Sequence, residues 1–123
     1  MDIATILDSE KGVEKVMGDI LRVLYLYRRL WLTEIYMEIE GMNTTLRNEA
    51  PSYDDVVNAA KELEKKGLIK LEKRLRSSLS HASGVEDYLV SLNEDPELLR
   101  ALSIDDKLIE YMRIRDKLLK FKD

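Results

Sequence analysis

A dense run of basic side chains lies between residues 65 and 76 of this 123-residue chain. Its six cations accompany a single carboxylate, that of Glu72, so the run has a local net charge of +5 while the whole chain carries −4. Clustered Lys and Arg bind phosphate groups; a solvated charged surface is the alternative. The run therefore predicts a site for a phosphate-rich polymer, formed by Lys65, Lys66, Lys70, Lys73, Arg74 and Arg76.

Residue types suited to catalysis or metal binding are scarce. The chain has no Cys and one histidine, His81, which excludes a thiolate zinc site, a thiol nucleophile and a cluster of imidazole ligands. The adjacent carboxylates Asp54 with Asp55 and Asp105 with Asp106 point apart on a helix, so they do not share a proton. We expect no catalytic residues, no metal site and no cofactor, and we expect His81 to be exposed in its Ser-rich stretch.

The composition is that of one folded domain covering residues 1–123. Hydrophobic residues make up 45% and charged residues 36%, and the absence of Cys and Gln beside this charge density is typical of thermophile proteins. The apolar runs are too short for a membrane span, and early acidic residues argue against a signal peptide. We expect a soluble cytoplasmic protein without membrane contact, of thermophilic type.

Apolar spacing of three and four residues predicts three helices in the first half of the chain. The first spans about 10–29 with Ser9 as its cap, and the second is a short helix that begins after Thr33 and ends near Gly41. A polar connection follows, and a third helix opens at Ser52 in a capping box with Asp55.

After Gly67 the pattern changes from helical to alternating, which predicts a strand over 68–75. A polar tip over 76–87 and a return strand over 88–92 complete a hairpin. Asp95 followed by Pro96 then opens a last helical region over 95–123. The expected fold is mostly α with a small β-hairpin.

The segment from Ser52 to Leu92 resembles the third helix and wing of winged helix-turn-helix transcription regulators of archaeal type, without matching one subfamily. The likeness is carried by the stretch AKELEKKGLIK over 60–70, in which Leu63 anchors the helix, Gly67 permits a sharp turn and Leu68 with Ile69 re-enter the core. The resemblance implies a three-helix core with a two-stranded wing over 10–92, followed by a C-terminal helix.

This resemblance implies that the third helix and the wing face double-stranded DNA on one side. The six cations of the basic run would then converge on phosphates, and Tyr53, Asn58 and Lys61 would approach the bases, with Asn58 suited to adenine and Lys61 to guanine. His81 at the wing tip would be a further contact to the minor groove.

Two features keep a different class of function open. The third helix begins with Asp54 and Asp55, whose carboxylates interact favourably with the positive end of the helix dipole but repel phosphate. The connection before this helix is also longer than the turn of a helix-turn-helix. The alternative is a winged-helix module that binds another protein, in a transcription, replication or membrane-remodelling complex, without direct DNA contact.

The last helical region is amphipathic and must bury its apolar stripe. Packing on the chain's own core and pairing with a second subunit both satisfy this need, and the resemblance favours a homodimer. The residues expected in the dimer contact are Ile104, Leu108, Tyr111, Met112, Leu118 and Leu119.

Overall fold

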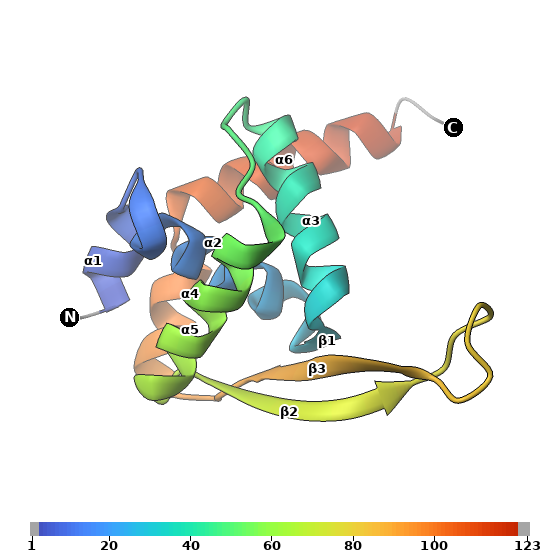
Figure 1. The fold of residues 1–123 in the computed structure, drawn as a ribbon. Coiled ribbons are helices and arrows are strands. Elements are labelled where there is room, and N and C mark those ends of the chain that lie inside the picture. The colour runs from blue at the N-terminus through green and yellow to red at the C-terminus, as the bar shows by residue number, and fades with distance from the viewer. Residues whose placement is uncertain (1–2, 121–123) are drawn as a thin grey trace.

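A computed structural model of the chain describes residues 3–120, which form helices and one small antiparallel sheet (Figure 1). The coarse prediction of a mostly helical protein with a β-hairpin is confirmed. In chain order the elements are α1 (Ile3–Asp8), α2 (Gly12–Tyr27), β1 (Arg29–Trp31), α3 (Leu32–Thr45), α4 (Tyr53–Lys65), β2 (Ile69–Arg76), β3 (Val85–Leu92), α5 (Pro96–Ser103) and α6 (Asp106–Lys120).

The sheet has the order β1-β3-β2, so the predicted hairpin is joined by a third strand that the sequence did not reveal. β1 has only three residues and pairs with β3 from Arg29 opposite Ser91 to Trp31 opposite Leu89. Its strand conformation depends on that pairing, because three residues carry too little alternation to indicate a strand. β2 and β3 are eight residues each, longer than predicted, and pair from Ile69 opposite Leu92 to Arg76 opposite Val85.

Helix α2 lies at the centre of the molecule. It contacts α1, α3, α4, α5 and both β1 and β3, and its middle turns are almost completely buried. The apolar core forms a single cluster that includes Ile6 of α1, Ile35 of α3, Leu63 of α4, Val90 of β3 and Leu108 of α6. All the helices and the base of the hairpin are therefore held by one core.

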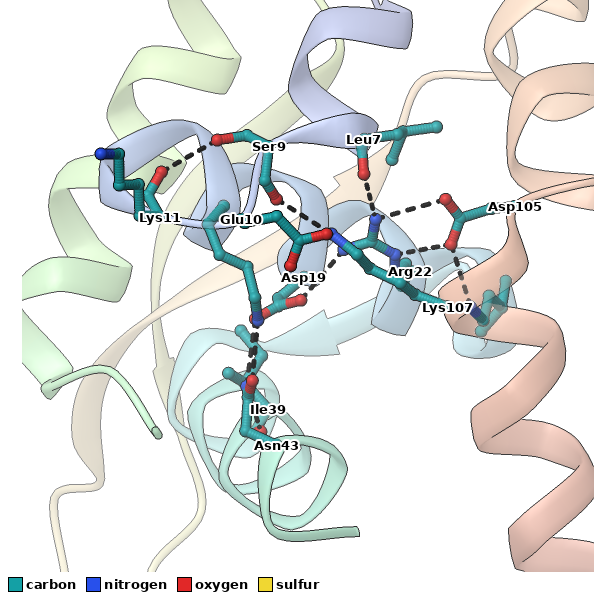
Figure 2. A network of polar contacts seen from close by, with 12 residues as sticks. Leu7, Ser9, Glu10, Lys11, Asp19, Arg22, Ile39, Asn43, Asp105 and Lys107 are labelled. Atoms are coloured by element: carbon teal, nitrogen blue, oxygen red, sulfur yellow. Dashed lines mark hydrogen bonds and ion pairs between the residues drawn. The ribbon is translucent and has the colours of Figure 1, made fainter. Parts of the chain in front are cut away.

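A buried polar network ties α2 to its neighbours (Figure 2). The side chain of Arg22 is buried, with 1% exposure. Its Nε donates to Asp105 at 2.6 Å, its Nη1 donates to Asp19 at 3.0 Å, and its Nη2 donates to the carbonyl oxygen of Leu7 at 2.7 Å. The other oxygen of Asp19 accepts from Lys15 at 2.6 Å and from Asn43 at 3.0 Å. The network joins α1, α2, α3 and the turn before α6, and no buried side-chain nitrogen or oxygen among residues 3–120 lacks a hydrogen-bond partner.

Three predicted helix boundaries are wrong. Ser9 does not cap α2: its hydroxyl donates to the carbonyl of Lys11, and α2 begins at Gly12. Thr33 lies inside α3, which begins at Leu32. Gly41 does not end α3, which continues to Thr45 with Gly41 in open space on its surface. Solvent exposure makes a helical glycine tolerable here, at a cost of about 1 kcal/mol relative to Ala.

Other local signals are confirmed. Ser52 and Asp55 form the capping box at the start of α4, with both hydrogen bonds at 3.1 Å. Gly67 ends the turn after α4 with φ of +75°. Asp95 caps α5, as predicted, and the last helical region is divided into α5 and α6, with Asp105 capping α6 by accepting from the backbone N–H of Leu108. The helix α1 was not predicted, and residues 121–123 of the predicted C-terminal region lie outside the described residues.

Within residues 3–120, none of the helices combines the length and the apolar character needed to cross a membrane.

We predict that Arg22→Met lowers the free energy of unfolding by about 3–5 kcal/mol, because it leaves the carboxylates of Asp19 and Asp105 buried without their shared cation. Urea denaturation followed by circular dichroism measures the change. Arg113→Met is the matched control, since Arg113 pairs with Glu110 on the exposed surface of α6 and its loss should leave stability nearly unchanged. Equal effects of the two substitutions would contradict the role given to the network.

Candidate nucleic-acid interface

The junction between α4 and β2 fixes how the basic run is displayed. The N–H of Leu68 donates to the carbonyl of Leu63 at 3.1 Å, and the side chain of Asn93 donates to the carbonyl of Gly67 at 2.7 Å. Leu68 and Ile69 are buried, as predicted. The end of α4 and the start of β2 are thus held together, so Lys65 and Lys66 lie directly before the strand that carries the other four cations.

Helix α4 presents a mixed surface opposite its buried face. Val56, Ala59, Ala60 and Leu63 are buried, as expected of an inward stripe, and helical geometry places Asp54, Asn58, Lys61 and Lys65 on the opposite side, where all four are exposed. The whole helix carries four carboxylates and two cations, a net charge of −2. Its first turn is acidic, and its positive charge is confined to the second half.

Strand alternation divides the four cations of β2 between the two faces of the hairpin. Lys70, Arg74 and Arg76 lie on one face, and Lys73 lies on the other face with Leu75. The expectation that the whole run converges on one side is therefore wrong, because consecutive residues of a strand point in opposite directions.

Three of the hairpin cations form exposed ion pairs. Glu72 accepts from Lys70 at 3.0 Å and from Arg74, both on its own face of the strand. Lys73 pairs with Glu86 across the hairpin at 3.1 Å. The Lys70, Lys73 and Arg74 side chains are 65%, 65% and 50% exposed, so these pairs lie in water and are weak.

Arg76 has a different environment. Its Nε donates at 3.0 Å to Asp87, a buried residue of β3 whose carboxylate also accepts from the hydroxyl of Thr33 at 2.6 Å. The carboxylate of Asp87 needs this cation, because a buried charge without a partner is strongly destabilising. Arg76 therefore stabilises the attachment of the hairpin to α3, and its predicted role as a free phosphate contact requires correction.

The residues that were expected near bases lie on α4 and at the tip of the hairpin. Lys61 is exposed on α4, one turn before the hairpin junction. Asn58 borders a cleft of about 550 Å³ between α4, the preceding loop and the start of α2, where Lys15 is already bound to Asp19 and Asn43. His81 is exposed at the tip of the hairpin.

Tyr53 is only partly exposed. Its ring packs edge-on against the ring of Tyr36, with centroids 5.6 Å apart. Burial, followed by the negative charge of Asp87 and the nearby Tyr88, raises the pKa of Tyr53 above its ordinary value. The ring therefore packs α4 against α3 while it remains 38% exposed, so part of it is accessible to contacts outside the chain.

The predicted dimer residues also divide into two groups. Leu108 and Tyr111 are 1% and 8% exposed and belong to the chain's own core, and Met112 packs against that core. Leu108 and Tyr111 cannot also form a dimer surface without opening the core, so this part of the prediction requires correction. Ile104, Leu118 and Leu119 are 69%, 57% and 56% exposed.

Several interactions at this surface were not predicted. Glu64 of α4 accepts the backbone N–H of Leu71, and Thr33 binds Asp87 between elements far apart in the chain. Only the pairing of Glu72 with its neighbours had a sequence signal, since residues two apart on a strand share a face. Among residues 3–120 there is no group of three or more His, Asp or Glu side chains placed to hold a metal ion.

In comparisons with known proteins, no protein-family model matches the chain, and no curated protein matches its sequence.

We predict that Lys70→Ala raises the pKa of Glu72 towards its ordinary value. Hydrogen bonds from Lys70, and then from Arg74, hold that pKa low in the folded protein. A lowered pKa in the folded state means that the pairs contribute stability above the unfolded-state pKa and lose that contribution as the pH falls through the folded-state pKa. NMR titration of the Glu72 carboxyl carbon measures the shift, and Lys66→Ala, which removes a neighbouring cation not bound to Glu72, should leave it unchanged.

Proposed function

We propose that the chain is a winged-helix protein that binds double-stranded DNA and acts as a transcription regulator. The order α2, β1, α3, α4, β2 and β3 supports the fold, since α2, α3 and α4 form a three-helix core and a hairpin follows directly after the third of these helices. This hairpin, the wing, projects beyond the helices (Figure 1). α5 and α6 then supply the C-terminal helical region.

One observation carries the proposal: the basic side chains along α4 and the wing, with the exception of Arg76, are exposed and only weakly held. Residues 61–87 contain seven cations and five carboxylates, a net charge of +2, and the rest of the chain has a net charge of −6. Exposed ion pairs contribute about 0–1 kcal/mol each, so Lys70, Lys73 and Arg74 can exchange a carboxylate for a DNA phosphate at little cost.

The charge distribution favours contacts with the DNA backbone over reading of bases. Asp54 and Asp55 make the first turn of α4 repulsive to phosphate, so the second half of the helix is the part that can approach a groove. Lys61 and Lys65 lie there, beside the wing. Such an interface gives strong salt dependence with modest sequence selectivity, because phosphate contacts carry no sequence information directly.

Exposed apolar side chains near the C-terminal helix provide a surface on which a second copy of the chain can pack. Ile104, Leu118 and Leu119 are exposed, and so is Ile109 on α6. Exposed apolar side chains on a terminal helix gain stability by pairing with the same surface of a second copy. We propose a homodimer through these residues of α6 and of the turn that precedes it.

One observation favours the second candidate, a module that binds another protein in a transcription, replication or membrane-remodelling complex. The helix that would enter the DNA groove has a net charge of −2, and each cation of the wing already has a carboxylate partner. Such a surface is closer to that of a protein interface than to that of a dedicated DNA reader.

The DNA proposal is tested by fluorescence anisotropy with a labelled duplex at several salt concentrations. Lys70→Ala combined with Arg74→Ala, which removes two exposed cations from one face of the wing, should weaken binding to all duplexes alike and should lower the slope of log affinity against log salt by about 2, one for each lost phosphate contact. The matched control is Lys117→Ala combined with Lys120→Ala, which removes the same charge from the last turn of α6.

A substitution that removes a carboxylate, where the previous test removes cations, provides a second test of DNA binding. Glu72→Gln releases Lys70 and Arg74 and should tighten DNA binding, whereas Glu110→Gln makes the same charge change on α6 and should not. Unchanged affinity and salt slope in the double variant, or no duplex binding at low salt, would favour the protein-binding module.

We predict that the chain sediments as a dimer and that Leu118→Glu combined with Leu119→Glu converts it to a monomer, because charges are costly in an apolar contact. Sedimentation velocity measures the mass. Leu79→Glu is the matched control: Leu79 is fully exposed at the wing tip, and its substitution should leave the dimer intact. A monomeric wild-type chain would refute the dimer proposal.

A further inference from the structure

The wing has an open backbone edge. In the sheet order β1-β3-β2, β3 is central and β2 is an outer strand of eight residues, which runs along the margin of the sheet in Figure 1. Outer strands expose unpaired N–H and C=O groups that can bond to another extended chain. The outward backbone groups of β2 are therefore a binding surface distinct from its side chains.

The hydrogen bonds of the sheet show which residues point outward. The N–H of Asn93 donates to the carbonyl of Leu68, so the even-numbered residues of β2 bond to β3. The odd-numbered residues Leu71, Lys73 and Leu75 direct both backbone groups away from β3. The N–H of Leu71 confirms this assignment, because it donates at 3.2 Å to Glu64 of α4.

Glu64 covers only the first part of this edge. The N–H groups of Lys73 and Leu75 donate to no acceptor among residues 3–120. Lys73 is exposed, and Leu75, at 66% exposure, presents an apolar side chain beside its outward backbone groups. The outer half of β2 thus combines free donors and acceptors with an uncovered apolar residue.

The charge of the strand determines what can pair with it. β2 carries four cations and one carboxylate, a net charge of +3. A strand added at the edge lies about 4.8 Å from β2. Glu86 and Asp87 of β3 reach Lys73 and Arg76 at 3.1 Å and 3.0 Å and offset two of these charges, so Lys70 and Arg74, with Glu72 between them, keep the strand positive. A second copy of β2 would place like charges together, which disfavours self-pairing.

We propose that the outer edge of β2 over Lys73–Leu75 binds an extended, acidic segment of a partner protein, which adds to the sheet as a fourth strand. Backbone hydrogen bonds to Lys73 and Leu75 hold the segment, its carboxylates meet Lys70 and Arg74 on one face of the sheet, and an apolar residue covers Leu75 on the other face. This partner-binding function is additional to the proposed DNA binding and does not depend on it. A bound acidic strand neutralises the same cations, so partner and DNA would compete.

The test uses a synthetic, end-capped peptide of alternating Glu and Val added to the full chain labelled with ¹⁵N. We expect the amide hydrogens of Lys73 and Leu75 to exchange at least tenfold more slowly, and chemical shifts to change along β2. Leu75→Pro removes one outward donor without removing a bond to β3, and should weaken peptide binding at least tenfold. Leu75→Val, which keeps the donor, should retain binding.

A second measurement needs no variant of the protein, in case Leu75→Pro fails to fold. Two versions of the same peptide carry N-methyl groups on alternate backbone amides, one on the odd-numbered and one on the even-numbered residues. Both keep the side chains, but one of them cannot donate backbone hydrogen bonds to β2, and that version should bind at least tenfold more weakly. A peptide with Lys in place of Glu should not bind.

Three results would overturn the proposal. These are equal binding of the acidic and basic peptides, equal binding of both methylated peptides and the parent, and protection of the Lys73 and Leu75 amides that rises with protein concentration in the absence of peptide. The last would identify a second copy as the occupant. DNA affinity is measured separately, so failure of this proposal and failure of the DNA proposal give different results.

Discussion

The guanidinium of Arg22 is the interaction around which the helices are arranged. A buried cation is tolerated only when carboxylates and carbonyls satisfy its donors, and Arg22 takes these from α2 itself, from the end of α1 and from Asp105. The same requirement accounts for Gly18, because a Cβ there would lie 3.0 Å from Nη1 of Arg22 and 3.2 Å from the carbonyl of Ile6. α1 and the α5–α6 turn can therefore take only positions that bring oxygen atoms to this one side chain.

The buried carboxylate of Asp87 positions the hairpin, as Arg22 positions the helices. Asp87 accepts from Thr33 and Arg76, which fastens the far half of the sheet to the start of α3. Only the tip of the hairpin, over 77–84, lies beyond this attachment. The surface that we propose for DNA and for an acidic strand lies between two fixed points, the α4–β2 junction and the Asp87 contact, so a small fold presents a long binding edge on a rigid support.

Local signals in the sequence predicted much of this architecture, and contacts between distant residues account for what was missed. Ser52 with Asp55, Gly67 and Asp95 with Pro96 act within a few residues, so the start and end of α4 and the start of α5 could be placed from the sequence. β1 and the binding of Thr33 to Asp87 depend on pairing across the fold, which no short window contains. At the candidate site, the sequence located the cations but not their division between two faces, although strand alternation already implied it.

The link between Arg22 and Asp105 also bears on when the protein can become native during synthesis. These residues are 83 positions apart, a stretch that a ribosome takes roughly 4–17 s to add, whereas an isolated helix forms in about a microsecond. Until Asp105 has been added, the central helix holds a cation with only one of its two carboxylates. Most of the apolar core is therefore synthesised before the group that completes its central ion pair, and the last helical region adds both that carboxylate and the core residues Leu98, Leu102, Leu108 and Tyr111.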